Sequence, residues 1–254
     1  MVYNSNMERI KTLIIGGGAA GLYLANSLAK PQETLLIERG ERLGRKLSST
    51  GNGQGNLTNL GVLNAEYFSV QKNPQASARI QKLLTAFDQE SMIEFFKTIG
   101  VLTIADERGR VYPSSRQASA LTDALRFSLE RKGVRTRLST QAISLRKKGG
   151  MYEITVKDKE GETDTLFAEN VVLCAGGKAA KNFGTDGTSY ALAQDFGHTL
   201  TALYPSLVQL KTDVTHTKTL KGIRVNNGVA TVQTPKRTQS FQGDIIFTDY
   251  GSVN

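Results

Sequence analysis

The chain has 254 residues, and its 32 Lys and Arg against 23 Asp and Glu give a formal net charge of +9. This length suits one large domain or two ordinary ones. A single cysteine, Cys174, excludes a disulfide scaffold, a thiolate zinc cluster and a C-x-x-C redox pair. The hydrophobic content of 39% is typical of globular proteins, and no stretch is apolar enough to span a bilayer. We therefore expect a cytoplasmic protein with no membrane partner.

The first forty residues have the pattern of a βαβ unit. Residues 11–15 predict a strand, the glycines at 16 to 18 a sharp turn, residues 19–30 a helix closed by Pro31, and residues 34–37 a second strand. Strand, turn, helix and strand in this order predict a parallel sheet. The three glycines also interrupt the apolar run that would otherwise resemble a secretory leader.

The middle of the chain continues this α/β pattern. Residues 39–60 have little periodicity and are rich in Gly, Asn, Ser and Thr, which predicts a functional loop. Further elements are helices over 76–87, 89–99 and 117–131, a hairpin over 101–116, and strands over 134–138, 152–156, 163–168 and 171–174. The last strand runs into Gly176 and Gly177, a second junction of a strand with glycines.

Beyond Pro205 the pattern changes to short apolar pieces at 207–210, 229–232 and 245–247, separated by Thr, Asn and Lys. Short strands without helices between them indicate a β-rich domain. We therefore predict two domains, an α/β domain over residues 1–200 and a β-rich domain over residues 201–254.

The strongest chemical signal is Gly16-x-Gly18-x-x-Gly21, with Glu38 twenty residues after Gly18. In such a motif the first glycine makes the tight turn, the second lets a pyrophosphate approach the backbone, and the third lets helix and strand pack closely. The helix N-terminus then attracts the phosphates, and the acid binds the adenosine ribose. The sequence therefore predicts a dinucleotide site. An acid at the ribose favours NAD or FAD over NADP, and the motif leaves NAD and FAD open.

Six further segments carry a family resemblance: GRKLSSTGNGQGNLTN at 44–59, GRVYP at 109–113, CAGG at 174–177, GTDG at 184–187, YPSLV at 204–208 and IFTDYG at 246–251. On these segments the chain resembles the BaiN-like and aminoacetone-oxidase-like FAD flavoproteins, a branch of the glutathione-reductase-type Rossmann proteins. The sixteen-residue loop is the specific part of the resemblance. Two positions depart from the family: Gln54-Gly55 stands where many relatives have Arg-Cys, and Asp249 where they have His.

The resemblance implies an α/β fold in which residues 1–200 form a glutathione-reductase-type, FAD-binding Rossmann-like domain. Residues 201–254 would then start an inserted β-barrel-like domain, and a small helical domain is also implied. Relatives continue past this point to a glycine-rich segment that closes the flavin site. We therefore expect this chain to lack the family's C-terminal part.

The motif and the resemblance together imply a cofactor site of glycines, short side chains and three charged residues. The resemblance places residues 44–59 along the FAD pyrophosphate and flavin, Ala142 near the adenine, and Gly176-Gly177 beside the cofactor. Lys46 can offset pyrophosphate charge, and the short polar side chains supply donors and acceptors without blocking a flat ring. The expected cofactor-binding residues are Gly16, Gly18, Ala19, Ala20, Gly21, Glu38, Arg39, Lys46, Ser49, Gly51, Asn52, Gly53, Asn56, Thr58, Asn59, Ala142, Ala175, Gly176 and Gly177.

No catalytic residue and no metal site is predicted. His198 and His216 lack the spacing of metal ligands, and Cys174 at the end of an apolar strand indicates a buried side chain rather than a reactive thiol. Tyr112 and Asp249 lie in family-like motifs and are candidates either for substrate contact or for structural roles.

The predicted function is an FAD-dependent oxidoreductase that transfers a hydride between a small organic substrate and flavin N5. The resemblance implies either amine oxidation with oxygen or reduction of an activated double bond, and the direction stays open. NAD(P)H is a candidate external electron donor. No second G-x-G-x-x-G with a following acid is present, so we expect no dedicated NAD(P) domain.

Two alternatives from other classes remain. One is a flavin-dependent RNA-binding or tRNA-modifying protein, suggested by eight basic residues against Glu130 between positions 126 and 148: Arg126, Arg131, Lys132, Arg135, Arg137, Arg146, Lys147 and Lys148. We favour the reading of this run as a solvated surface. The other is a truncated chain that binds a nucleotide without turnover. The oligomeric state is not predicted.

Overall fold

The computed structural model describes residues 10–64, 67, 74–205, 210–211, 213, 215, 217–248 and 251–253. The chain divides into two compact units, Met1–Leu200 (unit 1) and Thr201–Asn254 (unit 2). The strand expected over 207–210 lies outside the described residues except for its last position. His216 and Asp249 also lie outside them.

A six-stranded sheet forms the centre of unit 1, in the order β6-β2-β1-β9-β8-β7. Its strands are β1 (Ile10–Ile15), β2 (Thr34–Ile37), β6 (Arg135–Arg137), β7 (Gln141–Lys148), β8 (Met151–Lys157) and β9 (Thr163–Leu173). Strands β6, β2, β1 and the second half of β9 are parallel, whereas β7, β8 and the first half of β9 form an antiparallel meander. The parallel part is the βαβ arrangement that the sequence predicts.

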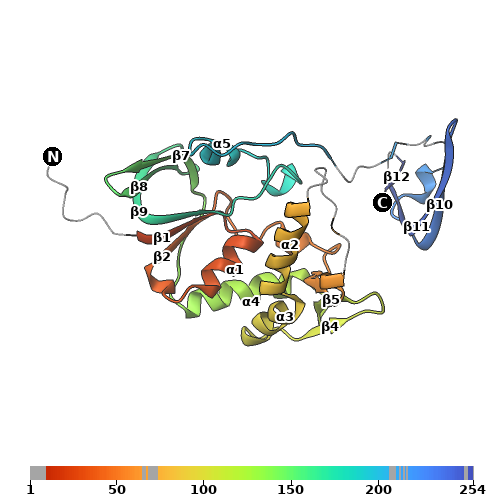
Figure 1. Cartoon of the computed structure of the whole chain (residues 1–254), viewed down its shortest axis with the longest axis horizontal. Helices are drawn as coiled ribbons and strands as arrows, with labels where there is room; N and C mark the ends of the chain where they lie inside the picture. Colours follow the sequence, from red (N-terminus) through yellow and green to blue (C-terminus); the bar gives the residue numbers. More distant parts are fainter. Residues whose placement is uncertain are drawn as a thin grey trace. The chain divides into compact units, whose positions relative to one another are not determined.

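Two hydrophobic cores lie on the two faces of this sheet. The helices are α1 (Ala19–Ser27), α2 (Pro74–Ala86), α3 (Gln89–Thr98), α4 (Ala118–Arg131) and α5 (Tyr190–Gln194). In β1, Ile14 packs against Leu22 of α1 and Leu125 of α4. Leu13 and Ile15, on either side of it, belong to the other core, together with Ile154 of β8. Alternate strand residues point to opposite faces, so one strand feeds both cores. Figure 1 shows α1 and α4 on one side of β1 and β2, and β7 to β9 on the other.

A second, small sheet orders the end of the long loop over residues 39–60. Strands β3 (Thr58–Asn59), β5 (Arg110–Pro113) and β4 (Thr103–Ala105) are antiparallel, in the order β3-β5-β4. The hairpin predicted over 101–116 is therefore confirmed. Upstream, the same loop contains a short 3-10 turn at Leu47–Ser49.

Two expectations for unit 1 were wrong in detail, and two elements were missed. The first helix ends at Ser27 rather than at Lys30, because Leu28 already has an extended backbone. The two strands expected over 163–174 are one strand, since Ala168 pairs with β8 and also with β1. Strand β7 was missed because its charged outer half hides the alternation of an edge strand. Helix α5, which is only five residues long, was also missed.

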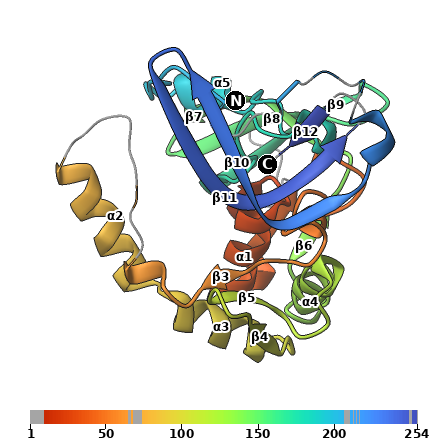
Figure 2. The same cartoon turned by 90° about the vertical axis from the view of Figure 1, so that its right-hand side faces the viewer.

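Unit 2 is a three-stranded antiparallel sheet of β10 (Arg224–Thr234), β11 (Arg237–Thr248) and β12 (Gly251–Val253). Figure 2 shows β10 and β11 as a long, curved hairpin. These strands are longer than the pieces predicted over 229–232 and 245–247, because exposed polar residues continue the hydrogen-bond ladder. The predicted α/β, Rossmann-like fold class is confirmed. Within the described residues, no helix has both the length and the apolar character needed to cross a bilayer.

The two faces of α4 give a test of the core. Leu125 is 1% exposed, whereas Phe127 on the same helix is 61% exposed. We expect Leu125→Ala to lower the free energy of unfolding of unit 1 by about 2–5 kcal/mol, because it leaves a cavity among packed side chains. Phe127→Ala, the matched control, should change it by less than about 0.5 kcal/mol.

Urea denaturation followed by far-ultraviolet circular dichroism measures this difference, since every α-helix among the described residues lies in unit 1. Equal losses for the two variants would contradict the assignment of α4 to the core.

Candidate functional site

The candidate site lies where three parallel strands end together. Gly16 to Gly18 follow β1, Glu38 follows β2, and Cys174 to Gly177 follow β9. The amide of Gly16 donates to the carbonyl of Ile37 (2.8 Å), and the amide of Cys174 donates to that of Ile15 (2.7 Å). In open α/β sheets, ligands bind in the crevice outside such carboxyl ends.

The three motif glycines differ in what an added side chain would meet. At Gly21 a Cβ would lie 1.9 Å from the carbonyl oxygen of Gly16, so helix α1 can pack this closely against the glycine turn only because residue 21 has no side chain. Gly16 has a φ of +109°, and a Cβ there would lie 2.6 Å from the backbone of Ala175. A Cβ at Gly18, in contrast, would meet no atom within 4 Å. Gly18 therefore faces open space, where only a ligand would require the absence of a side chain.

Two backbone amides hold the Glu38 carboxylate at the end of β2. Its Oε2 accepts a hydrogen bond from the amide of Gly17 and its Oε1 one from the amide of Gly40, both at 2.7 Å. Each carboxylate oxygen can accept a second hydrogen bond. The acid is therefore fixed in orientation and retains acceptor capacity for a hydroxyl of a ribose.

A cavity of about 440 Å³ opens beside the glycine turn. This volume lies within the roughly 300–1,000 Å³ of small-molecule sites. Its lining includes four cationic side chains and one acidic side chain, that of Glu38. The lining residues are Gly16, Gly17, Gly18, Ala19, Ala20, Glu38, Arg39, Gly40, Arg42, Arg45, Lys46, Leu47, Thr50, Cys174, Ala175, Gly176, Phe183, Gly184 and Thr185. Nine of the sequence-predicted residues are thus brought together, whereas Arg42 and Arg45 were missed although they lie just before Lys46 in the same loop.

A smaller cavity of about 60 Å³ adjoins the first and shares Glu38, Arg39 and Gly184 with it. Ala142, which the resemblance places near an adenine, lies in its wall. The lining residues are Ile15, Gly16, Ile37, Glu38, Arg39, Thr140, Gln141, Ala142, Ala175, Gly184, Asp186, Thr188, Ser189 and Leu192. The two cavities together follow the edge of the sheet from the glycine turn to the start of β7.

Several other expected site residues line neither of these two cavities: Gly21, Ser49, Gly51, Asn52, Gly53, Asn56, Thr58, Asn59 and Gly177. The loop near residue 53 is held against α4, because the carbonyl of Gly53 accepts from the amide of Ala118 (2.7 Å). Asn59 uses its side chain locally, donating to the Arg108 carbonyl (3.0 Å) and accepting from the Gly61 amide (2.8 Å). The flavin contacts of this loop stay a prediction from the resemblance.

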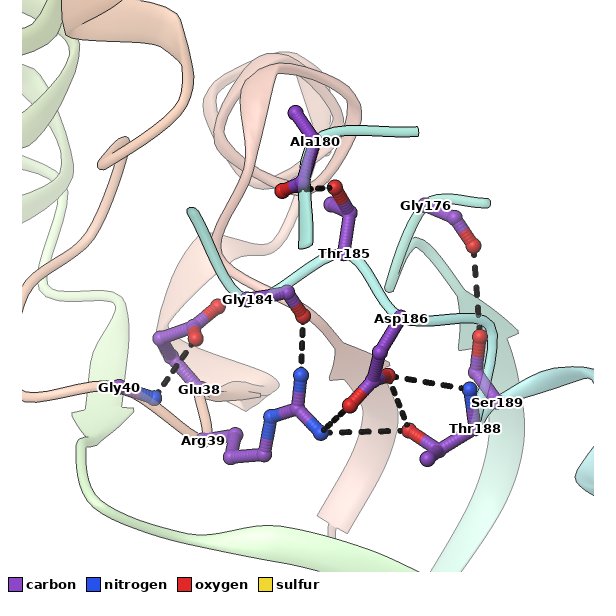
Figure 3. A network of polar contacts seen from close by, with 10 residues as sticks. All are labelled: Glu38, Arg39, Gly40, Gly176, Ala180, Gly184, Thr185, Asp186, Thr188 and Ser189. Atoms are coloured by element: carbon purple, nitrogen blue, oxygen red, sulfur yellow. Dashed lines mark hydrogen bonds and ion pairs between the residues drawn. The ribbon is translucent and has the colours of Figure 1, made fainter. Parts of the chain in front are cut away.

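Arg39 has a partner that sequence reasoning missed. Its Nη1 lies 2.9 Å from Asp186 Oδ2, and the guanidinium also donates to the carbonyl of Gly184 (Figure 3). The hydrogen bonds from Arg39 and Thr188 hold the pKa of Asp186 well below its usual range, so this carboxyl is ionised at neutral pH. The GTDG segment was the available signal, but nothing in the sequence connects it to Arg39.

The candidates outside the glycine turn have mainly structural contacts. Tyr112 is buried, and the Arg116 guanidinium lies 4.7 Å from its ring centroid. Burial raises the pKa of the Cys174 thiol, which keeps it protonated at neutral pH. His198 is exposed. In the described part of the chain, no group of three or more His, Cys, Asp or Glu side chains is arranged to hold a metal ion.

The residues of the basic run between 126 and 148 lie on several elements, and some of them have acidic partners. They lie on α4 and directly after it, on β6 and on β7, and only three residues join β6 to β7. Several have partners: Arg126 pairs with Asp123 (3.3 Å), Arg137 with Asp164 (2.7 Å) and Lys148 with Glu153 (2.9 Å). These contacts favour the solvated-surface interpretation of the run.

Two curated proteins are similar to this chain in sequence. The chain is 32% identical over 243 residues to the 3-dehydro-bile acid delta(4,6)-reductase of Clostridium scindens, covering 94% of this chain and 56% of the relative. It is 27% identical over 248 residues to the ribosomal RNA dihydrouridine synthase of Escherichia coli, covering 96% of this chain and 58% of the relative. The chain thus spans little more than half the length of these curated relatives.

Among solved structures, the open conformation of a flavocytochrome c3 fumarate reductase matches with a TM-score of 0.57 at 17% identity, over 87% of this chain and 47% of that one. This likeness concerns the fold. The HI0933-like protein Rossmann domain family matches residues 10–243. The family resemblance expected from the sequence is therefore confirmed: this chain belongs to the HI0933-like protein Rossmann domain family.

Proposed function

We propose that the chain is the FAD-binding part of a flavin-dependent reductase that saturates a carbon–carbon double bond conjugated to a carbonyl group. Unit 1 is then the FAD-binding domain, and unit 2 the start of the inserted β-rich domain. The observation that carries the proposal is the cleft itself: a glycine turn, a fixed acid and four cations around about 440 Å³. Glu38 favours an unphosphorylated ribose, as in FAD.

The residues of the cleft fit a dinucleotide. Helix α1 has no side-chain cap and no acid in its first turn, so its first amides are available to an anion. Gly18 leaves room for a pyrophosphate to approach them, and Arg45 and Lys46 add positive charge. On the other side of Glu38, Ala142 lies in the wall of the smaller cavity, where an adenine would be placed.

The names of the two relatives support the type of reaction. A delta(4,6)-reductase of a 3-dehydro acid acts on double bonds conjugated to the 3-oxo group, and a dihydrouridine synthase saturates the uracil double bond conjugated to a carbonyl. The isoalloxazine of FAD supplies hydride transfer at N5 for such a reduction. The balance requires a hydride and a proton added across the double bond, with NAD(P)H oxidised to NAD(P)⁺ as the external donor. The chain's part is to bind and orient the cofactor.

An RNA substrate is the second candidate, and the identity to a ribosomal RNA dihydrouridine synthase favours it. Arg42, Arg45 and Lys46 are exposed at the mouth of the cleft. RNA binding through such cations would weaken steeply with salt, because it releases condensed counterions. A small-molecule substrate is preferred here because the longer basic run is partly neutralised.

The first test is the absorption spectrum of the purified chain, followed by mass analysis of the released ligand. We expect bound FAD that is bleached anaerobically by NADPH or NADH and reoxidised by an α,β-unsaturated ketone. A chain that binds NAD, or that cannot be reconstituted with FAD, would contradict the proposal. FAD that no donor reduces would favour the non-catalytic alternative. Reoxidation only by a uridine-containing RNA would favour the second candidate.

Gly18 gives a test of the pyrophosphate position. Because a Cβ at Gly18 meets no protein atom within 4 Å, Gly18→Ala should fold normally. We expect it to weaken FAD binding by roughly tenfold or more, since the methyl group occupies the space of the pyrophosphate. Gly243→Ala in unit 2 is the matched control, because a Cβ there also meets nothing within 4 Å.

Isothermal titration with FAD and the thermal unfolding midpoint separate binding from folding. Unchanged FAD affinity in Gly18→Ala would place the pyrophosphate elsewhere.

A further inference from the structure

The side chain of Arg39 joins the end of β2 to the loop between β9 and α5. Its Nη1 contacts Asp186 Oδ2 at 2.9 Å and donates to Thr188 Oγ1 at 3.3 Å, and its Nη2 donates to the carbonyl of Gly184. Figure 3 shows these contacts converging on the guanidinium from one side. One arginine thus binds three positions of the loop, which lies almost 150 residues further along the chain.

The loop over residues 176–189 is bonded mainly to itself. Thr185 donates to the carbonyl of Ala180 (2.9 Å), Ser189 donates to that of Gly176 (3.3 Å), and Asp186 accepts from the Thr188 amide (3.1 Å). Among the described residues outside the loop and its immediate flanks, Arg39 alone forms hydrogen bonds with the loop. The loop is therefore a compact piece with one polar attachment to the rest of unit 1.

The backbone of the loop is unusual at several points. Gly176, Gly184 and Gly187 have φ values of +76°, +89° and +84°. Ala180 has a φ of +66°, a conformation that costs free energy for a residue with a Cβ. Glycines near both ends of the loop provide positions where the backbone can rotate at low cost.

This attachment stands between the two cavities of the cleft. Arg39 and Gly184 line the cavity of about 440 Å³ at the glycine turn and also the one of about 60 Å³ at Ala142. The smaller cavity, at about 60 Å³, lies well below the roughly 300–1,000 Å³ of small-molecule sites, so an adenine there gains room when the loop moves away from Arg39. A dinucleotide extending from Gly18 to Ala142 passes directly beside the contact between Arg39 and this loop.

We propose that residues 176–189 are a lid over the adenosine end of the cleft, fastened by the ion pair between Arg39 and Asp186. This inference rests on the proposed FAD site. The two side chains are 34% and 29% exposed, and ion pairs near the surface are weak, so breaking this fastening costs little free energy. The lid opens for the adenosine, closes beside it and slows its release. Arg39 and Asp186 act on the cofactor through the position of the loop.

Stopped-flow fluorescence of FAD binding tests the lid through association and release rates. We expect Asp186→Asn to speed both rates by about two- to fivefold, since it removes the charge that fastens the loop. Arg39→Lys should give an intermediate effect, because lysine keeps the charge without the forked geometry. The double variant Arg39→Ala/Asp186→Asn should be no faster than the single variant Arg39→Ala, because Arg39→Ala already removes the cationic partner of Asp186. Glu153→Gln, which breaks another ion pair of 2.9 Å, is the matched control and should change neither rate.

Hydrogen–deuterium exchange of the FAD-free protein gives a readout that does not need the cofactor. Asp186→Asn should raise exchange in residues 176–189 and leave β1 and β2 unchanged. Unchanged exchange in the loop would overturn the lid, as would unchanged FAD rates. Slower association with unchanged exchange would also overturn it, because Asp186 would then contact the cofactor directly. A wild-type chain that binds no FAD would contradict the proposed function, while the exchange result still decides whether the ion pair fastens the loop.

Discussion

The contact between the backbones of Gly21 and Gly16 is the constraint on which the rest of unit 1 depends. A Cβ at Gly21 would lie 1.9 Å from the Gly16 carbonyl oxygen, so α1 can follow β1 this closely only because that atom is missing. The helix then covers one face of the parallel strands, and its first backbone amides lie at the carboxyl ends of these strands. Packing and the binding cleft therefore have the same origin.

Around this contact, the charged groups are held in place by other parts of the protein before any ligand is bound. Glu38 is oriented by the amides of Gly17 and Gly40, and Arg39 by the loop that contains Asp186. The fixed carboxylate of Glu38 loses little conformational entropy when a ligand arrives, which favours affinity. Lys46, in contrast, is exposed and can adjust to the charge of the ligand.

The two relatives carry names with different substrates. One carries the name of a bile acid reductase and the other that of a ribosomal RNA dihydrouridine synthase, and the chain matches both over nearly its full length. Fold alone does not define function, and the function must be argued from the site. Our proposal assigns the shared reduction chemistry to the cleft of unit 1. Because the chain spans only 56% and 58% of these relatives, it assigns no substrate-recognition residue.

The βαβ unit and the glycine turn with Glu38 could be predicted without a structure, because strand alternation and glycine spacing are local patterns. The family could be predicted from the resemblance of short segments. The sequence also placed nine of the residues that line the larger cavity, including Lys46 and Gly176. The pairing of β7 with β8, the junction of the two cavities and the partnership of Arg39 with Asp186 emerged only in the tertiary structure. Each depends on how separate elements meet, and contacts between distant segments leave no local pattern in one sequence.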